Sequence, residues 1–553
     1  LRDELRALES QSMANCITGF IMLILHSMDP DTFKTQRDEA RLLMERALEI
    51  NQANMWAHLG MKDILFYEQA YDAAIEQLTQ AIQVVPENPR LYFELGECHL
   101  LAQVERPMIQ QTALQNAYDA YKQAMRLDPT YAPAYFRVAF VSEQRAAYDQ
   151  AIEFYQQGLT LNPTNIFAHF RLGRIYALNG MLDLASSRFR EVISLSSRLR
   201  IENYQEGYIF NKLRFFKEAN ALGAWIELGN ILTKRRQYSE ALEAYQKALS
   251  IDRNSTLAVV NQINLYKLQS QDAKDVETTY DRYIDQYKNA AMVDPQSPIV
   301  HFAHAYACQV FPSKMPEKQE ERLEQSLNGY QLAINLDPNF KWAYWGLKDA
   351  YLTPIAGGSP LYDEAVEACR QVVALDPEDP RGYYELGTVY CRMGQIELAQ
   401  ENFNLAIQHD MMYIPAYFSM AEIRRRAGTF DDAIKLYQRV IRINPNYARG
   451  YFELGDVYKE TGQNEKALSN LRKAVELDLD YLDAHFAIGE ISFAEGNDEN
   501  ALMRFRRVLE LDPHHAIAHN RLAQIQHRRG QREDAISSYK AAIELAADPT
   551  GPQ

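Results

Sequence analysis

The chain of 553 residues has little cysteine and tryptophan and no long hydrophobic run. Its five cysteines are scattered and odd in number, which argues against a disulfide framework and favours small buried thiols in a reducing compartment. The most apolar stretch, residues 16–28, is too short to span a bilayer, and no basic segment precedes it as in a signal peptide. These features favour the cytoplasm, leave the periplasm open, and predict no direct membrane attachment.

Basic surface charge is also scarce. The chain has 58 Lys and Arg against 74 Asp and Glu, a formal net charge of −16. General binding to nucleic acids or anionic membranes needs a basic surface, so the composition predicts neither kind of partner. It fits protein partners that are neutral or basic.

Catalytic motifs are absent as well. The sequence holds no glycine-rich phosphate loop, no GxSxG elbow and no HExxH pair, so we predict no enzyme and no cofactor. His301, His304 and Cys308 share one helical face, and His515 and His519 lie four residues apart. Both spacings suit zinc, but no further ligand is evident, and histidine also stands at the aromatic position of other repeats. We therefore predict no metal site.

What the chain does have is a repeat of about 34 residues, the length typical of helical solenoids. Three successive copies share an aromatic residue, then a large apolar residue, then Gly or Ala: Tyr383, Leu386, Gly387; Tyr417, Met420, Ala421; Tyr451, Leu454, Gly455. A second helix carries small and aromatic residues, as at Ala241, Tyr245 and Ala248. The spacings put each set on one helical face, so every repeat reads as two helices. Proline then ends most repeats, because it disfavours helix at the residue before it.

These motifs resemble the tetratricopeptide repeat (TPR) family, with W/Y-x-x-L-G-x-x-Y in the first helix and A-x-x-x-F/Y-x-x-A…P in the second. Trp56, Leu59 and Gly60 match well, as do Trp225, Leu228 and Gly229. The resemblance covers almost the whole chain. It implies an all-α, right-handed superhelical solenoid whose concave groove is lined by the first helices. We count about fourteen helix pairs.

The repeats divide the chain into five predicted regions. They are N-terminal helices with a degenerate first repeat (1–52), a TPR array (53–197), a non-repeat insert (198–220), an array with lengthened repeats (221–377), and a regular array with a C-terminal cap (378–549).

Two kinds of extra sequence interrupt the period. Several repeats are stretched between their helices, near residues 103–111, 269–277, 311–321 and 352–359. These additions predict either longer helices and tolerated loops or a second contact surface along one edge. The insert 198–220 is aromatic and mildly basic, and its Tyr208, Phe210 and Phe215 suit either an extra helix that patches the stack or a docking element.

The TPR resemblance implies that the residue after the first aromatic faces the groove. Here that residue is often aromatic: Phe93, Phe136, Phe170, Trp345, Tyr384, Phe418, Phe452 and Phe486. These rings are predicted to grip a peptide or helix through apolar contact, the alternative being that they pack sideways and support the groove wall.

Charged residues flank these rings. Glu422, Asp456 and Glu490 lie one helical turn further on and predict a mixed, acid-leaning groove. Arg424, Arg425 and Arg426 on one first helix are candidates for binding an acidic segment, or form a solvated face.

Three hypotheses for function follow. The first is a non-enzymatic scaffold that holds protein partners within a larger assembly, of the kind found in bacterial envelope machinery for pili, secretion or polysaccharide export. The second is the regulatory or substrate-presenting arm of an enzyme such as a glycosyltransferase. The third is a homo-oligomer formed through the apolar N-terminal helix, with the charged last helix, residues 532–540, acting as a cap.

Overall fold

The computed structural model describes residues 9–15, 33–68, 70–105, 110–198, 220–271, 275–354 and 358–547. Throughout these ranges the regular structure is helical, so the predicted all-α repeat fold is confirmed. Residues 199–219 of the predicted insert, with Tyr208, Phe210 and Phe215, lie outside the described part, as does the apolar stretch 16–28. The roles predicted for both segments stay predictions.

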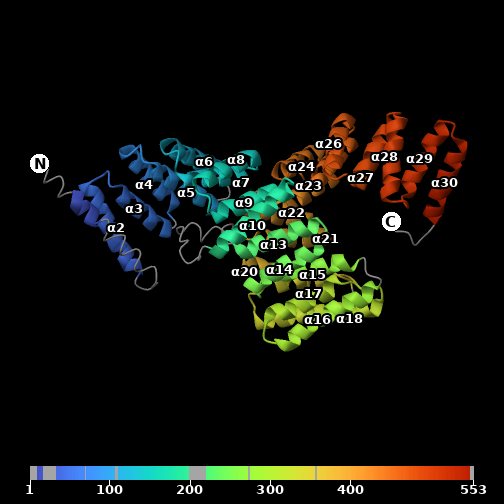
Figure 1. Ribbon diagram of the computed structural model, residues 1–553, viewed down its shortest axis with the longest axis horizontal. Helices are drawn as coiled ribbons and strands as arrows, with labels where there is room; N and C mark the ends of the chain where they lie inside the picture. The colour runs from blue at the N-terminus through green and yellow to red at the C-terminus, as the bar shows by residue number, and fades with distance from the viewer. Residues whose placement is uncertain are drawn as a thin grey trace. The chain divides into compact units, whose positions relative to one another are not determined.

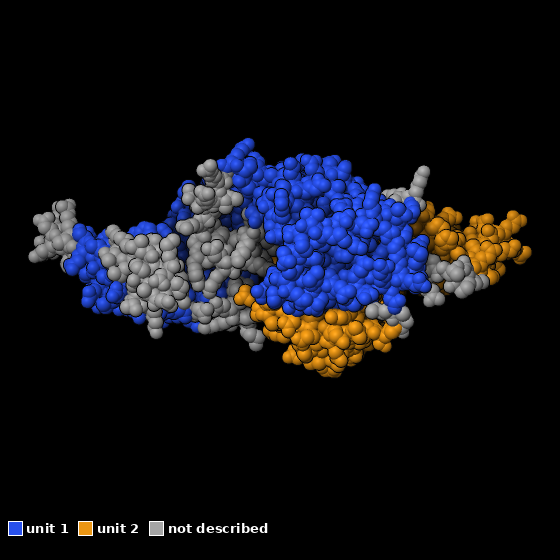
Figure 2. Space-filling view, turned by 90° about the horizontal axis from the view of Figure 1, so that it is seen from below, with its two compact units in different colours: residues 1–177, 181–350, 355–357 blue, residues 178–180, 351–354, 358–553 orange. Residues whose placement is uncertain are grey.

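The chain forms two compact units (Figure 2). Unit 1 comprises residues 1–177, 181–350 and 355–357, and unit 2 comprises residues 178–180, 351–354 and 358–553.

The helices of unit 1 follow one another with short turns between them. They are α2 (Phe33–Ile50), α3 (Met55–Tyr67), α4 (Tyr71–Val84), α5 (Pro89–Glu105), α6 (Gln110–Leu127), α7 (Ala132–Gln144), α8 (Tyr148–Leu161), α9 (Ile166–Leu178), α10 (Leu182–Arg198), α13 (Ala221–Lys234), α14 (Tyr238–Ile251), α15 (Thr256–Ser270), α16 (Val276–Val293), α17 (Pro298–Val310), α18 (Pro316–Leu336) and α19 (Lys341–Tyr351), whose last residue falls in unit 2.

The helices of unit 2 are more uniform in length. They are α20 (Tyr362–Leu375), α21 (Pro380–Arg392), α22 (Ile396–His409), α23 (Ile414–Arg426), α24 (Phe430–Ile443), α25 (Ala448–Glu460), α26 (Asn464–Leu477), α27 (Leu482–Ala494), α28 (Asp498–Leu511), α29 (Ala516–Arg528) and α30 (Arg532–Ala547).

Consecutive helices pack as pairs, and the pairs stack in chain order (Figure 1). In unit 2 the pairs are α21–α22, α23–α24, α25–α26, α27–α28 and α29–α30, and each second helix also contacts the first helix of the next pair. Each repeat therefore buries its apolar face against its neighbours, as expected of a solenoid.

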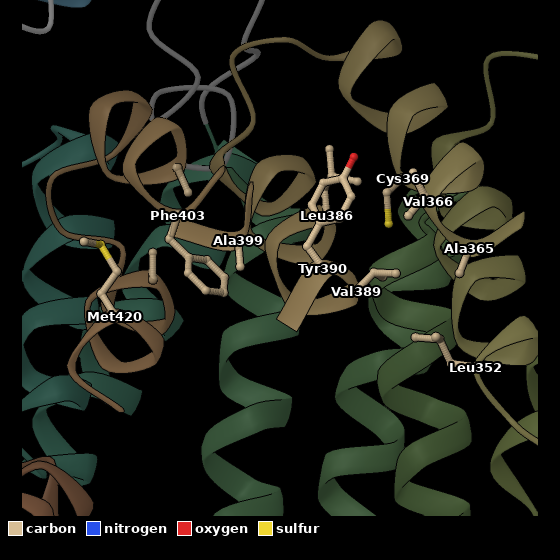
Figure 3. Close-up of a cluster of buried hydrophobic side chains, with 12 residues drawn as sticks. Leu352, Ala365, Val366, Cys369, Leu386, Val389, Tyr390, Ala399, Phe403 and Met420 are labelled. Carbon is tan, nitrogen blue, oxygen red and sulfur yellow. The ribbon is translucent and has the colours of Figure 1, made fainter. Parts of the chain in front are cut away.

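Glycine in the first helix permits the close approach within a pair. A Cβ added to Gly387 on α21 would lie 2.6 Å from the Phe403 ring on α22, and one added to Gly229 on α13 would lie 2.4 Å from the Tyr245 ring on α14. Figure 3 shows Phe403 and Ala399 facing Leu386 and Tyr390 across the pair α21–α22. The helix-propensity cost of glycine is thus offset by a large buried ring.

The turn within a pair also favours glycine. Gly462 between α25 and α26 has φ 72°, whereas Arg236 occupies the equivalent turn between α13 and α14 with φ 60°. A side chain in this left-handed region is disfavoured by contact between Cβ and the backbone.

We expect Arg236→Gly to stabilise unit 1 by about 0.5–1 kcal/mol, because relief of the left-handed strain exceeds the added chain entropy of glycine. The Arg236 side chain is exposed, so little packing is lost. Urea unfolding followed by circular dichroism measures the change, and Gly462→Arg is the matched control, with a loss of similar size. A less stable Arg236→Gly variant would contradict the strain argument.

The lengthened repeats are accommodated mainly by longer second helices. α16 has 18 residues and α18 has 21, against 14 for α22. The two stretched segments also contact each other: the buried Arg322 guanidinium lies 2.9 Å from Glu277 and 2.7 Å from Asp281, and Lys318 lies 3.2 Å from Glu277. Their charged groups thus satisfy one another, which favours the structural interpretation of these two additions.

This cluster makes unit 1 sensitive to acid. Burial alone would raise the pKa of Glu277 and Asp281, but hydrogen bonds and the charges of Lys318 and Arg322 outweigh it and lower both values. The unfolded pKa values are about 4, so the two carboxylates stabilise the fold above that pH, and their contribution is lost as pH falls through the lower folded values.

We therefore expect the urea midpoint of the chain to fall between about pH 5 and pH 2, and to fall less steeply in an Arg322→Met variant. The difference between the two pH profiles isolates this cluster from the other carboxylates. Identical slopes would show that Arg322 does not set the two pKa values.

Candidate partner-binding surface

Four first helices of unit 2 each carry one aromatic side chain at the equivalent position. We name Tyr384, Phe418, Phe452 and Phe486 the aromatic row; they come from α21, α23, α25 and α27, and each is half-buried. The local reason is the helical period, which places the residue after the buried first aromatic partly outside the core. The row is the largest repeated feature of the predicted partner-binding set.

Each ring of the row packs on other side chains over part of its surface. Tyr384 has its ring centroid 5.7 Å from Phe403 in its own repeat and 5.6 Å from Tyr413, which precedes the next first helix. Phe418 makes the same two contacts, at 5.5 Å to Tyr437 and 6.3 Å to Tyr447.

The pattern continues along the array. Phe452 lies 5.1 Å from Tyr481, and Phe486 lies 5.8 Å from Phe505 and 4.9 Å from His515. The alternative expected from the sequence, sideways packing, is therefore present together with partial exposure. Such contacts fix the ring orientation, so a partner would meet apolar surface that is already ordered.

The corresponding residues of unit 1 differ in exposure. Phe136 is 4% exposed and Phe170 is 1% exposed, and every residue from 136 to 143 on α7 is buried. Direct contact with a partner, as predicted for these two rings, does not fit this burial; they belong to the core. Phe93 and Trp345 are half-buried, like the aromatic row.

The acidic residues beside the row already hold cations. Asp456 bonds Arg425 and lies 2.9 Å from Lys459. Glu490 lies 2.7 Å from Arg521, and Glu422 lies 2.9 Å from Arg426. The predicted acid-leaning character is thus largely compensated, because cations from the same helix or the next repeat neutralise it.

The three consecutive arginines have different environments. Arg425 binds three carboxylates of α25: Glu453 at 3.0 Å, Asp456 and Glu460. Arg426 is 79% exposed and pairs with Glu422 on its own helix. Arg424 is half-exposed and, among the described residues, forms no ion pair. Only Arg424 and Arg426 are therefore suited to an acidic partner segment.

The carboxylates around Arg425 titrate in opposite directions. Burial alone would raise the pKa of Asp456, but hydrogen bonds and charge from Lys459 and Arg425 lower it. Burial raises the pKa of Glu453 despite Arg425 and Arg449. Arg425 thus acts as a structural link between α23 and α25.

Ion pairs between successive first helices recur along the chain. In unit 1, Lys62 on α3 lies 2.8 Å from Glu94 on α5, Glu97 on α5 lies 2.6 Å from Arg137 on α7, and Glu143 on α7 accepts a 3.0 Å hydrogen bond from Arg171 on α9. In unit 2 the same register holds Arg425 with α25 and Glu490 with Arg521. We call these pairs the ionic ladder.

Two rungs of the ladder are buried. The side chains of Arg137 and Glu97 are each 3% exposed, and the Tyr121 hydroxyl donates to Glu97 at 2.5 Å. Burial and the Glu97 charge raise the pKa of Tyr121 well above its usual range. The Glu143 carboxylate is held in the same way, by Arg171 and by Tyr155 at 3.1 Å.

Histidines at the first aromatic position serve the backbone. His301 Nε2 lies 2.9 Å from the Pro295 carbonyl oxygen, and His519 Nε2 lies 3.0 Å from that of Pro513. Tyr383 donates to the Pro377 carbonyl in the same way, at 3.1 Å. In the described ranges, no three His, Cys, Asp or Glu residues form a group that could hold a metal ion.

One hollow of about 460 Å³ in unit 1 lies between α10 and the pair α13–α14. Its lining is polar and includes Arg190, Glu191 and Arg235, the last of which pairs with Asp183 at 2.6 Å. Charges of both signs line it, so it selects no particular ligand. Elsewhere in the described part, no helix combines the length and apolarity needed to cross a membrane.

Sequence comparison agrees with the repeat architecture. Profiles described as TPR repeat match residues 63–101, 421–462 and 455–494, and profiles described as tetratricopeptide repeat match residues 132–165, 223–255, 368–401 and 499–552. The chain is a tetratricopeptide repeat protein. As members of that family generally do, it forms a protein-binding type of scaffold.

Two curated relatives match parts of this TPR protein. The probable UDP-N-acetylglucosamine–peptide N-acetylglucosaminyltransferase SPINDLY of Hordeum vulgare is 26% identical over 177 residues, 32% of this chain and 17% of that protein. Protein bimA of Emericella nidulans is 30% identical over 83 residues, 15% of this chain and 10% of that protein. The chain thus spans less than a fifth of the length of either relative.

Similar solved structures are also helical-repeat proteins. The APC/C heterotetramer Cut9–Hcn1 shows 15% identity and a TM-score of 0.38, with 90% of this chain and 94% of that chain covered. Yeast Tom70 shows 17% identity and a TM-score of 0.38, with 89% and 92% covered.

Proposed function

We propose that this TPR protein is a non-enzymatic scaffold that binds an extended or helical segment of a partner protein along the aromatic row of unit 2, within a larger assembly. The proposal includes no cofactor and no nucleic acid. Four half-buried rings at equivalent positions on successive first helices support it most strongly. A partner with apolar side chains at matching intervals would bury the remaining ring surface.

The order of the row favours binding. Because each ring already packs against a neighbouring ring, little side-chain entropy is left to lose when a partner binds. Exposed rings that are held in this way resemble the aromatic anchors that dominate interface energetics. The two flanking structural rings of unit 2 that are fully buried, Phe403 and Phe505, cannot play that role.

Charge around the row adds selectivity rather than a strong field. Arg449 stacks on Phe418 at 4.3 Å while its side chain stays 58% exposed. Arg426 is also exposed. Since the neighbouring acids are paired with cations, the partner segment is proposed to be mainly apolar, with polar or acidic flanks that reach these guanidinium groups.

A capture experiment tests the proposal. The chain is immobilised and partners are recovered from its native lysate, with wild type compared with a Phe418→Leu, Phe452→Leu, Phe486→Leu variant. Leucine keeps apolar packing and removes the ring, so partner recovery should fall while the thermal unfolding profile stays close to wild type.

The matched control changes three exposed apolar residues of unit 2 that lie outside the row: Leu398→Ala, Leu479→Ala and Met503→Ala. This variant should recover partners as wild type does. Equal recovery by the row variant and wild type would discard the aromatic row as the binding surface.

A second candidate function has one supporting observation. The match to SPINDLY concerns a protein whose name describes transfer of N-acetylglucosamine to peptides. The TPR array would then present substrates to a glycosyltransferase domain. Protein isolated from its native source would be assayed for transfer from UDP-N-acetylglucosamine to peptide, and absence of transfer by a preparation that still captures partners would leave the scaffold alone.

A further inference from the structure

The outer face of the last helix differs from the same face of every preceding second helix in unit 2. On α28, Leu502 is 6% exposed and Phe505 is fully buried. The equivalent residues of α30 are Ile536, which is 55% exposed, and Tyr539, which is half-buried. Seven residues after Ile536, Ile543 is 66% exposed, whereas its counterpart Leu509 is half-buried. We name Ile536, Tyr539, Ala542 and Ile543 the terminal face.

Within the array, this face is always the docking surface for the next first helix. Leu502, Phe505 and Val508 of α28 form one apolar cluster with Leu522 and Ile525 of α29. In the same way, Leu468 and Leu471 of α26 cluster with Ile488 and Ile491 of α27. Figure 1 shows α30 at the end of this series, with α29 beside it. No described helix lies on the terminal face.

The sequence prediction of a charged cap was therefore incomplete. Arg532, Glu533, Asp534 and Lys540 are exposed, as expected of a cap. The same helix nevertheless exposes two isoleucines with the spacing of a docking face. A cap that ended the array would replace them with polar residues, since nothing in the described part shields them from water.

We propose that the terminal face binds an amphipathic helix of a separate partner polypeptide, a helix with the pattern of this chain's own first helices. The pattern is defined by the internal junctions. α25, for example, carries Gly450, Glu453, Leu454 and Val457, which puts a small residue, a carboxylate and two aliphatic residues on or beside one face. This surface is distinct from the aromatic row and would add a second binding site to the proposed scaffold.

Charge favours such a partner over a second copy of the chain. The ionic ladder pairs the end of one first helix with the start of the next, as Arg425 pairs with Glu453. At the end of the array the corresponding rim is basic, with exposed His527, Arg528, Arg529 and Arg532. A carboxylate-bearing helix complements this rim, whereas a second copy would bring the same positive charges.

The experiment uses the full chain and a fluorescein-labelled peptide of residues 447–462, which carries the α25 pattern. Fluorescence anisotropy should show saturable binding that weakens at least tenfold with Ile543→Asp and with Ile536→Asp. Both residues are exposed, so the variants should fold, which circular dichroism checks. A peptide with Glu453→Arg should also bind several-fold more weakly, because its new cation meets the basic rim.

Leu479→Asp and Met503→Asp, two exposed apolar sites elsewhere in unit 2, are the matched controls and should bind the peptide as wild type does. The Phe452→Leu variant, which tests the aromatic row, should also bind normally, so the two proposals fail separately. Equal binding by wild type and both isoleucine variants would overturn the proposal. So would sedimentation showing a dimer that Ile543→Asp dissociates, because the terminal face would then belong to a second copy.

Discussion

Replacement of Arg137 by Met is expected to destabilise the α5–α7 region of unit 1 by about 3–5 kcal/mol. The reason is the carboxylate that remains. Glu97 is 2% exposed and would keep only the Tyr121 hydroxyl of the two partners described above. A buried charge without its counter-ion is far more costly than a missing pair. Hydrogen exchange of amides on α5 and α7 measures the loss locally, which suits a repeat array whose parts unfold separately.

The control removes both charges. A Glu97→Gln, Arg137→Met variant should recover most of the lost protection, because exchanging a buried ion pair for neutral groups is often close to neutral. If Arg137→Met alone changed protection by less than about 1 kcal/mol, Glu97 would have to be solvated or protonated, and the buried rung would not hold α5 to α7.

The second large effect is expected at the centre of the α21–α22 pair. Phe403→Ala should lower the free energy of unfolding of unit 2 by about 3–5 kcal/mol, because the ring is fully buried among Leu386, Tyr390 and Met420 (Figure 3). Urea unfolding by circular dichroism, with hydrogen exchange on α21 and α22, measures it.

A second substitution tests the geometric explanation. Gly387→Ala in the wild-type chain should destabilise by about 1–3 kcal/mol, since its Cβ would lie 2.6 Å from the ring. In the Phe403→Ala background the overlap is gone, and the same change should stabilise by up to about 1 kcal/mol through helix propensity. An effect of equal sign and size in both backgrounds would show that the ring does not require the glycine.

The fold was largely predictable from the sequence because its information is periodic. Gly387 and Gly229 are poor helix formers, and their regular recurrence predicted a close helix approach that the structure confirms through Phe403 and Tyr245. Prolines marked the ends of the repeats for the same local reason. The last helix was harder to predict, because its charges at one end concealed the exposed Ile536 and Ile543.

The site was less predictable, because its properties depend on contacts between repeats. Phe136 and Phe418 occupy equivalent sequence positions, yet one is buried and the other half-buried. The ionic ladder was missed, although opposite charges one period apart, such as Glu490 and Arg521, are a usable signal. Single residues were read by sign alone, whereas their pairing across repeats decides which charges remain available.

The scaffold proposal is tested most directly by photo-crosslinking. A benzoylphenylalanine placed in turn at Phe418, Phe452 and Phe486, and at the control sites Leu398, Leu479 and Met503, reports which surface a partner touches in native lysate. The account predicts crosslinked partner protein from the three aromatic-row positions and none from the three controls. Crosslinks at the control positions with none along the row would contradict it.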